Sequence, residues 1–173
     1  MKAICYATVM KHVLILIAAI ACAAPSITAA QVPADPAKML QIFSAPIKTG
    51  GGEFTITIVN DRTIDPLFGS SPSRFAIRAR ARMATIFFVQ GVANKDFDFN
   101  PDLTVVQKGE TLTGAASSVK NFTAGKITKG ETVQGLVEMP KKLNLYDPFD
   151  VKIGGQKAEF RLSPDDVTDY GNK

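Results

Sequence analysis

Residues 53–60, with the sequence EFTITIVN, alternate between apolar and polar side chains. In an extended chain Phe54, Ile56 and Ile58 share one face and the threonines share the other. This period of two predicts a β-strand with one buried face, which must cover a core together with other strands. After the first thirty residues no segment shows a sustained helical period, so the pattern excludes a helical bundle.

Turn signals separate further short apolar segments along the chain. The Gly154-Gly155 pair predicts a hairpin, and residues 61–73 predict a loop. We predict strands at residues 38–48 (an edge strand, because it contains Pro46), 53–60, 74–83 continuing to 89, 103–107, 132–139, 149–153 and 156–162. About eight short strands separated by turns favour an all-β fold, a single antiparallel β-sandwich.

Two nine-residue segments follow one template. VQKGETLTG occupies residues 106–114 and ITKGETVQG occupies residues 127–135. Each predicts a tight turn with a glycine, Gly109 or Gly130, in the left-handed region, followed by a return into a strand. Two copies are too few for a solenoid of stacked repeats.

Three pieces of the segment from Met83 to Leu162 resemble a known class of domain. They are the strand that leads to Asn94, the phrase KGET at 129–132 leading into GLVEMP at 135–140, and AEFRL at 158–162. The segment resembles bacterial exported immunoglobulin-like domains. The resemblance implies an immunoglobulin-like β-sandwich, which we place at residues 38–162, and it implies no activity.

The first thirty residues are typical of a secretory signal peptide. Lys2 and Lys11 precede an apolar run at 13–24, shorter than the roughly 20 residues of a membrane span. Small residues before the break predict cleavage after Ala30 and export to the periplasm or beyond. The alternative is a lipoprotein anchored at Cys22, because AIAC at 19–22 resembles the bacterial lipobox. Residues 31–37 would then form a flexible lead-in and residues 163–173 a polar C-terminal tail.

The processed chain would lack imidazole and thiol groups. His12, Cys5 and Cys22 are the only histidine and cysteines, and all lie in the first thirty residues. This excludes histidine-dependent and cysteine-dependent catalysis, and zinc or copper sites built from these side chains. We expect no cofactor. The processed chain would contain eighteen Lys and Arg and sixteen Asp and Glu, and this excess of positive charge is too small to predict nucleic-acid binding. No transmembrane span would remain after processing.

Four of the six arginines lie within nine residues: Arg74, Arg78, Arg80 and Arg82. On the predicted strand the last three share one face at steps of about 6.6 Å. Such an arginine ladder suits bidentate contacts to carboxylates or phosphates of an anionic partner. The alternative is a solvated face whose arginines pair with acids of a neighbouring strand.

Side chains with oxygen ligands recur at every second residue in Asp96, Asp98, Asn100 and Asp102. Oxygen ligands at this spacing are candidates for calcium, although Pro101 and Gln107 stand where an EF-hand loop has its glycine and bidentate glutamate. A solvated strand face gives the same pattern. Two other acidic groups, Asp147 with Asp150 and Asp165 with Asp166 and Asp169, are the candidate carboxylate pairs of a hydrolase.

These observations predict a non-catalytic binding or assembly module of the bacterial cell envelope, with a protein or anionic envelope partner at the arginine ladder. The alternatives are a small carboxylate-based hydrolase and a calcium-stabilised adhesion domain. The sequence leaves the ligand and the oligomeric state open.

Overall fold

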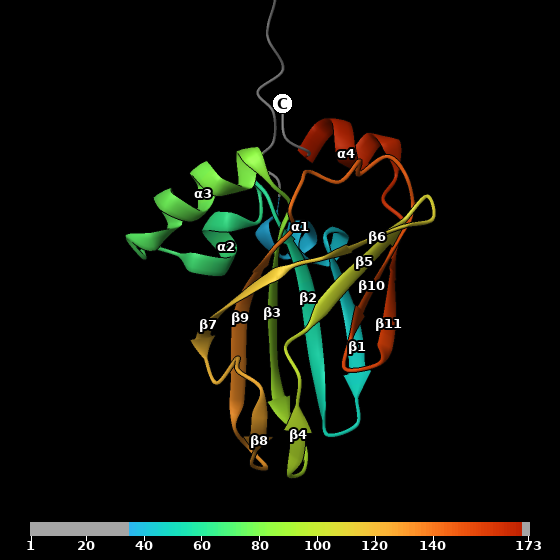
Figure 1. The fold of residues 1–173 in the computed structure, drawn as a ribbon. Helices are drawn as coiled ribbons and strands as arrows, with labels where there is room; N and C mark the ends of the chain where they lie inside the picture. Colours follow the sequence, from blue (N-terminus) through green and yellow to red (C-terminus); the bar gives the residue numbers. More distant parts are fainter. Residues whose placement is uncertain (1–34, 171–173) are drawn as a thin grey trace, which may run out of the picture. The chain divides into compact units, whose positions relative to one another are not determined.

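The computed structural model describes residues 35–170 (Figure 1). The predicted signal peptide, its cleavage point after Ala30 and the anchor candidate Cys22 lie outside these residues. Within the described part, antiparallel strands dominate, as the sequence predicts. Four helices also form in residues 35–170, so the chain is mostly β with antiparallel sheets, and the all-β prediction holds in this coarser form.

Two antiparallel sheets account for most of the strands in residues 35–170. The first sheet, in the order β1-β2-β3-β9-β7, comprises β1 (Ser44–Thr49), β2 (Gly52–Val59), β3 (Ile86–Ala93), β9 (Thr132–Glu138) and β7 (Ala115–Lys120). The second sheet, in the order β11-β10-β5-β6, comprises β11 (Gln156–Phe160), β10 (Phe149–Ile153), β5 (Leu103–Gln107) and β6 (Glu110–Thr113). A separate pair consists of β4 (Phe97–Phe99) and β8 (Gly125–Ile127). The strands predicted from residue 103 onward are confirmed.

The apolar faces of the two sheets share one core. The alternation that predicts β2 is confirmed, because Phe54 and the two isoleucines of that pattern are buried in this core. Between the sheets, the ring centroid of Phe87 in β3 lies 6.2 Å from that of Phe149 and 6.1 Å from that of Phe160. Phe149 and Phe160 stack on each other at 5.2 Å. These rings tie the first sheet to β10 and β11.

Two contacts close the sides of the core. Gly114 is the only residue between β6 and β7, so the chain passes there directly from the second sheet to the first. A Cβ atom on Gly114 would lie 2.3 Å from the side chain of Val137, which requires glycine at this crossing. On the opposite side, β1 lies next to β11.

A second group of phenylalanines packs over glycines of the strands. A Cβ atom on Gly135 would lie 2.1 Å from the ring of Phe122, and one on Gly51 would lie 2.1 Å from the ring of Phe97. Contacts between ring centroids at 5.4 to 6.3 Å join Phe54, Phe97, Phe99 and Phe122 into one cluster. The absence of side chains at the glycines therefore makes room for the rings.

We predict that Gly135→Ala destabilises the protein by about 1–3 kcal/mol, because the added methyl group must displace the buried ring of Phe122. Gly50→Ala is the matched control, since a Cβ atom there meets nothing within 4 Å, and we expect no loss of stability. Urea unfolding of the two variants measures the difference. Equal stabilities would contradict the packing of Phe122 over β9.

Helix α1 (Pro36–Ile42) replaces the first five residues of the edge strand predicted at 38–48 and begins inside the predicted lead-in. The Asp35 carboxylate accepts a hydrogen bond from the Ala37 N–H at 3.0 Å, and Pro36 occupies the first turn, where proline favours a helix. Met39 and Phe43, four residues apart, are both buried. The edge strand itself is β1, which begins only at Ser44.

Helix α4 (Pro164–Tyr170) corrects the prediction of a polar C-terminal tail. The Ser163 hydroxyl accepts a hydrogen bond from the Asp166 N–H at 3.1 Å and donates one to the Asp166 carboxylate at 2.6 Å. This reciprocal arrangement resembles a capping box and starts the helix. Val167 is buried, so the helix is held by an apolar contact as well.

The glycine turns are confirmed. Gly109 and Gly130 have φ values of 81° and 87°, and Gly154 and Gly155 have φ values of 55° and 76°. At the second copy of the template, the Glu131 carboxylate accepts a hydrogen bond from the Thr128 N–H at 2.7 Å. Hydrogen bonds from Thr128 hold the pKa of Glu131 below the usual glutamate value.

We predict that the Glu131 carboxylate stabilises this turn in a pH-dependent way. Because its pKa is lowered in the folded protein, its contribution is present above the pKa of an unfolded glutamate and is lost as the pH falls through the folded pKa. NMR titration of the Glu131 carboxyl group should give a pKa below that of a glutamate in a peptide. Glu131→Gln should remove this part of the pH dependence, and a normal or raised pKa would contradict the hydrogen bond.

Candidate functional site

The four predicted ladder arginines lie on a helix, α3 (Ser73–Met83), and the prediction of a strand at 74–83 is wrong. The segment SRFAIRARARM alternates, but it also places Ile77 and Ala81 four residues apart. Alanine, arginine and methionine all favour helices, and Arg80 and Arg82 lie in the last turn, where cations interact favourably with the helix dipole. The predicted loop before it contains the short helix α2 (Ile64–Phe68).

Helices α2 and α3 cover part of the outer face of the first sheet (Figure 1). Ile77 and Ala81 are buried in an apolar cluster that also contains Ile86 and Phe88 of β3. The ring of Phe68, at the end of α2, meets that of Phe88 edge-on at 5.3 Å. Because the buried stripe of α3 is fixed by this cluster, the helix presents a defined opposite face to solvent.

Two of the four arginines bind carboxylates of the α2 segment. Arg78 lies 3.3 Å from Asp61 and 3.0 Å from Asp65. Arg74 lies 3.9 Å from Asp65 and donates a hydrogen bond to the Gly69 carbonyl at 2.7 Å. These contacts hold α3 against α2, so neither guanidinium is presented on a ladder.

The other two arginines differ from each other. Arg80 binds Glu138 of β9, which attaches α3 to the first sheet. The side chain of Arg82 is exposed and contacts no carboxylate in the described part of the chain. Nearby, the Lys142 ammonium group donates a hydrogen bond to the Arg82 carbonyl at 3.3 Å. Of the predicted set, Arg82 is the residue left for a partner.

Two large apolar side chains stand on the solvent side of α3. Phe75 is 62% exposed and Met83 is 81% exposed, with the exposed Ala79 between them at helical spacing. The Arg74 guanidinium lies over the Phe75 ring, 4.8 Å from its centroid. We call Phe75, Ala79, Arg82 and Met83 the outward face of α3. The sequence prediction missed it, because on a strand Phe75, Ala79 and Met83 are assigned to the buried side.

We predict opposite outcomes for the same substitution at two alanines of α3. Ala81→Glu buries a charge in the cluster beneath the helix and should cost about 3 kcal/mol or more. Ala79→Glu adds a solvated helix-forming residue near Arg82 and should change stability by less than about 0.5 kcal/mol. Thermal and urea unfolding distinguish the two variants. On a strand both positions would share one face, so similar losses would contradict the helix.

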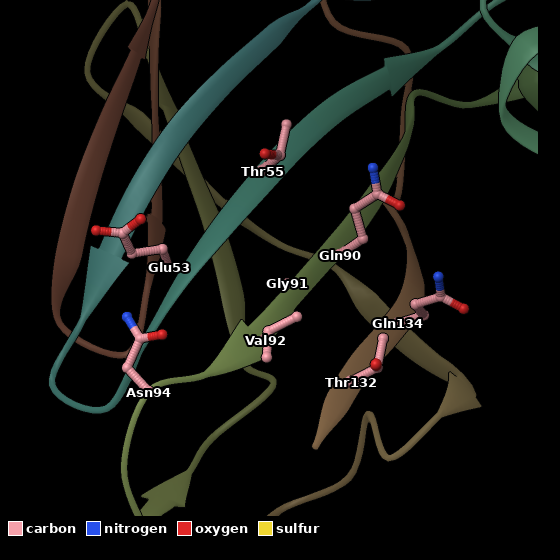
Figure 2. Close-up of a pocket in the computed structure, with 8 residues that line it drawn as sticks. All are labelled: Glu53, Thr55, Gln90, Gly91, Val92, Asn94, Thr132 and Gln134. Carbon is pink, nitrogen blue, oxygen red and sulfur yellow. The ribbon is translucent and has the colours of Figure 1, made fainter. Parts of the chain in front are cut away.

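A polar groove lies on the part of the first sheet that the helices leave open (Figure 2). Thr55, Gln90 and Gln134 face each other across the adjacent strands β2, β3 and β9. The groove has a volume of about 390 Å³, and neither glutamine amide has a hydrogen-bond partner among residues 35–170. The carboxylate that lines the groove, that of Glu53, lies 3.0 Å from the Lys48 ammonium group. The groove therefore offers neutral hydrogen-bonding groups, which the sequence prediction did not single out.

The calcium candidates are divided between two places. Asp98, Asn100 and Asp102 line a recess of about 520 Å³. There, the side-chain amide oxygen of Asn100 (Oδ1) accepts a hydrogen bond from the Asp102 N–H at 3.0 Å. Asp96 instead accepts a hydrogen bond from the Lys129 N–H at 2.9 Å. In residues 35–170 no three His, Cys, Asp or Glu side chains are grouped so that they could hold a metal ion.

Three of the five candidate hydrolase carboxylates bind other side chains in the described part of the chain. Asp147 lies 2.8 Å from Lys108, and Asp150 lies 3.1 Å from Lys157. Asp166 binds Ser163 at the start of α4, Asp165 is exposed on the same helix, and the side chain of Asp169 lies outside the described part. These contacts fit surface carboxylates with structural roles.

Comparison of the chain with protein-family models, with curated proteins and with solved structures found no match. In residues 35–170 no helix combines the length and the apolar character needed to cross a membrane. The functional argument therefore depends on the surface of the described unit.

Proposed function

We propose that this chain is an exported, non-catalytic binding or assembly module that docks on an anionic partner through the outward face of α3. The exposed pair Phe75 and Met83, beside Arg82, which no carboxylate of residues 35–170 contacts, is the observation that carries the proposal. Phenylalanine, methionine and arginine are enriched in protein interfaces, whereas lysine and glutamate are more frequent on the rest of the protein surface. A contiguous apolar patch exposed on a folded unit marks a contact site, and Phe75, Ala79 and Met83 lie at successive four-residue steps on one side of α3.

The corrected position of the arginines sharpens this proposal. Asp61 and Asp65 neutralise Arg78, and Glu138 neutralises Arg80. These two arginines therefore bind within the chain and are not available to a partner. The charge of Arg82 is not paired within residues 35–170 and is available to a partner. The arginine cluster thus combines a structural role with a smaller binding role.

The non-catalytic role rests on the residue chemistry. After cleavage at Ala30 the chain has neither histidine nor cysteine, and of the candidate carboxylates Asp147 and Asp150 bind lysines and Asp166 binds Ser163. As part of the same proposal, the two antiparallel sheets form an immunoglobulin-like sandwich. Their shared phenylalanine core and the crossing at Gly114 support this assignment.

We expect a photoreactive benzoylphenylalanine at Ala79 to form an adduct with an envelope component in intact cells. The control places the same group at Glu159, which is exposed on β11 in the second sheet. Mass spectrometry of the purified adducts identifies the component. An adduct at position 79 and none at position 159 supports the proposal. No adduct at position 79, or the same adducts at both positions, would refute it.

A further inference from the structure

We propose that the partner of the outward face of α3 is the surface of an anionic phospholipid bilayer, on which the helix lies with Phe75 and Met83 inserted among the headgroups. This inference rests on the proposed function and specifies its partner. It is carried by the spacing, the exposure and the charge of this face.

The apolar side chains protrude as a pair along the helix. Phe75 and Met83 are eight residues apart, which corresponds to about 12 Å along an α-helix. Ala76 and Ala79, both exposed, separate them and rise less far from the helix surface. Ile77 and Ala81 fix the opposite side of the helix against the sheet. A flat, deformable surface accommodates two protruding side chains together, whereas a protein would need two pockets at the same spacing.

The charges around this pair favour an anionic surface. The carboxylates near α3 are already neutralised: Arg74 and Arg78 pair with Asp65, Arg78 also pairs with Asp61, and Arg80 pairs with Glu138. Arg82 lies next to Met83 and has no carboxylate partner in residues 35–170, and the Lys142 ammonium group lies at the same end of the helix. Cations of this kind attract anionic headgroups within a Debye length of the bilayer.

The apolar and cationic parts complement each other as in interfacial helices. Such helices insert large apolar side chains to the level of the headgroups while arginines contact phosphates. In this chain Arg82 is the arginine placed to contact phosphates, because the Arg74 guanidinium over the Phe75 ring is held by Asp65 and the Gly69 carbonyl. A helix of this length, Ser73–Met83, lies on the bilayer and does not cross it.

The experiment is cosedimentation of the chain from Gln31 onward, which contains the whole described unit and omits the apolar run at 13–24. One set of vesicles contains equal parts of phosphatidylglycerol and phosphatidylcholine, and the other contains phosphatidylcholine alone. We expect binding to the anionic vesicles that weakens with added salt, and at least tenfold weaker binding to the neutral ones.

Variants separate the contribution of the apolar side chains from that of the cation. Phe75→Ser with Met83→Ser should weaken binding to the anionic vesicles at least tenfold, and Arg82→Gln about fivefold. Val119→Ser removes an exposed apolar side chain from β7, and Lys95→Gln removes a cation beyond the far end of β3; both should bind as the unsubstituted protein does. Ala79→Glu, which we expect to fold, should abolish binding.

Several results would overturn the inference. These are absence of binding to the anionic vesicles, equal binding to neutral vesicles, or equal losses in the control variants. The photoreactive group at Ala79 distinguishes this failure from failure of the proposed function. A phospholipid adduct supports both proposals, an adduct with an acidic protein refutes only the bilayer, and no adduct refutes both.

Discussion

The packing of phenylalanine rings against glycines holds the β4–β8 pair and the loop before β8 against the first sheet. Phe122 occupies the space that a side chain of Gly135 would fill on β9, and Phe97 does the same at Gly51, beside the start of β2. Through Phe99 these rings join Phe54 on β2, so the β4–β8 pair is held against the sheet. A core without tryptophan thus obtains large aromatic contacts from positions where the backbone is left uncovered.

The first sheet is covered on both faces over only part of its length, and β3 shows this division. Residues 86–89, IFFV, are all buried, because Phe87 and Val89 face the core while Ile86 and Phe88 face the helices. From Gln90 onward the outer face is open, and there the groove of Figure 2 lies. Along β3 the sequence therefore changes from a continuous apolar run to mixed polar and apolar residues at the point where α2 and α3 no longer cover the outer face.

The sequence predicted those elements whose signals are local. The hairpin at Gly154-Gly155 and the turns at Gly109 and Gly130 need a left-handed backbone, which glycine supplies, and the alternation in β2 has a single interpretation. In residues 73–83 two periods coexist. Ile77 and Ala81 fit a helix, while the arginines at every second position fit a strand, and only the apolar cluster on the sheet decides between them. Helix α1 had a readable signal in Asp35-Pro36, whereas the crossing at Gly114 depends on contacts distant in sequence.

The same ambiguity explains how the candidate surface arises. Once α3 is a helix, its residues divide into three groups: those buried on the sheet, those bound to carboxylates and those left outside. The exposed ion pairs of Arg74 and Arg80 contribute little to stability, on the order of 0–1 kcal/mol each, whereas Ile77 and Ala81 anchor the helix through buried contacts. Changes at Phe75, Arg82 or Met83 therefore act on the surface without altering the anchoring stripe. Folding and binding use different sides of one short helix, which is why the outward face can be apolar and cationic while the unit below it stays folded.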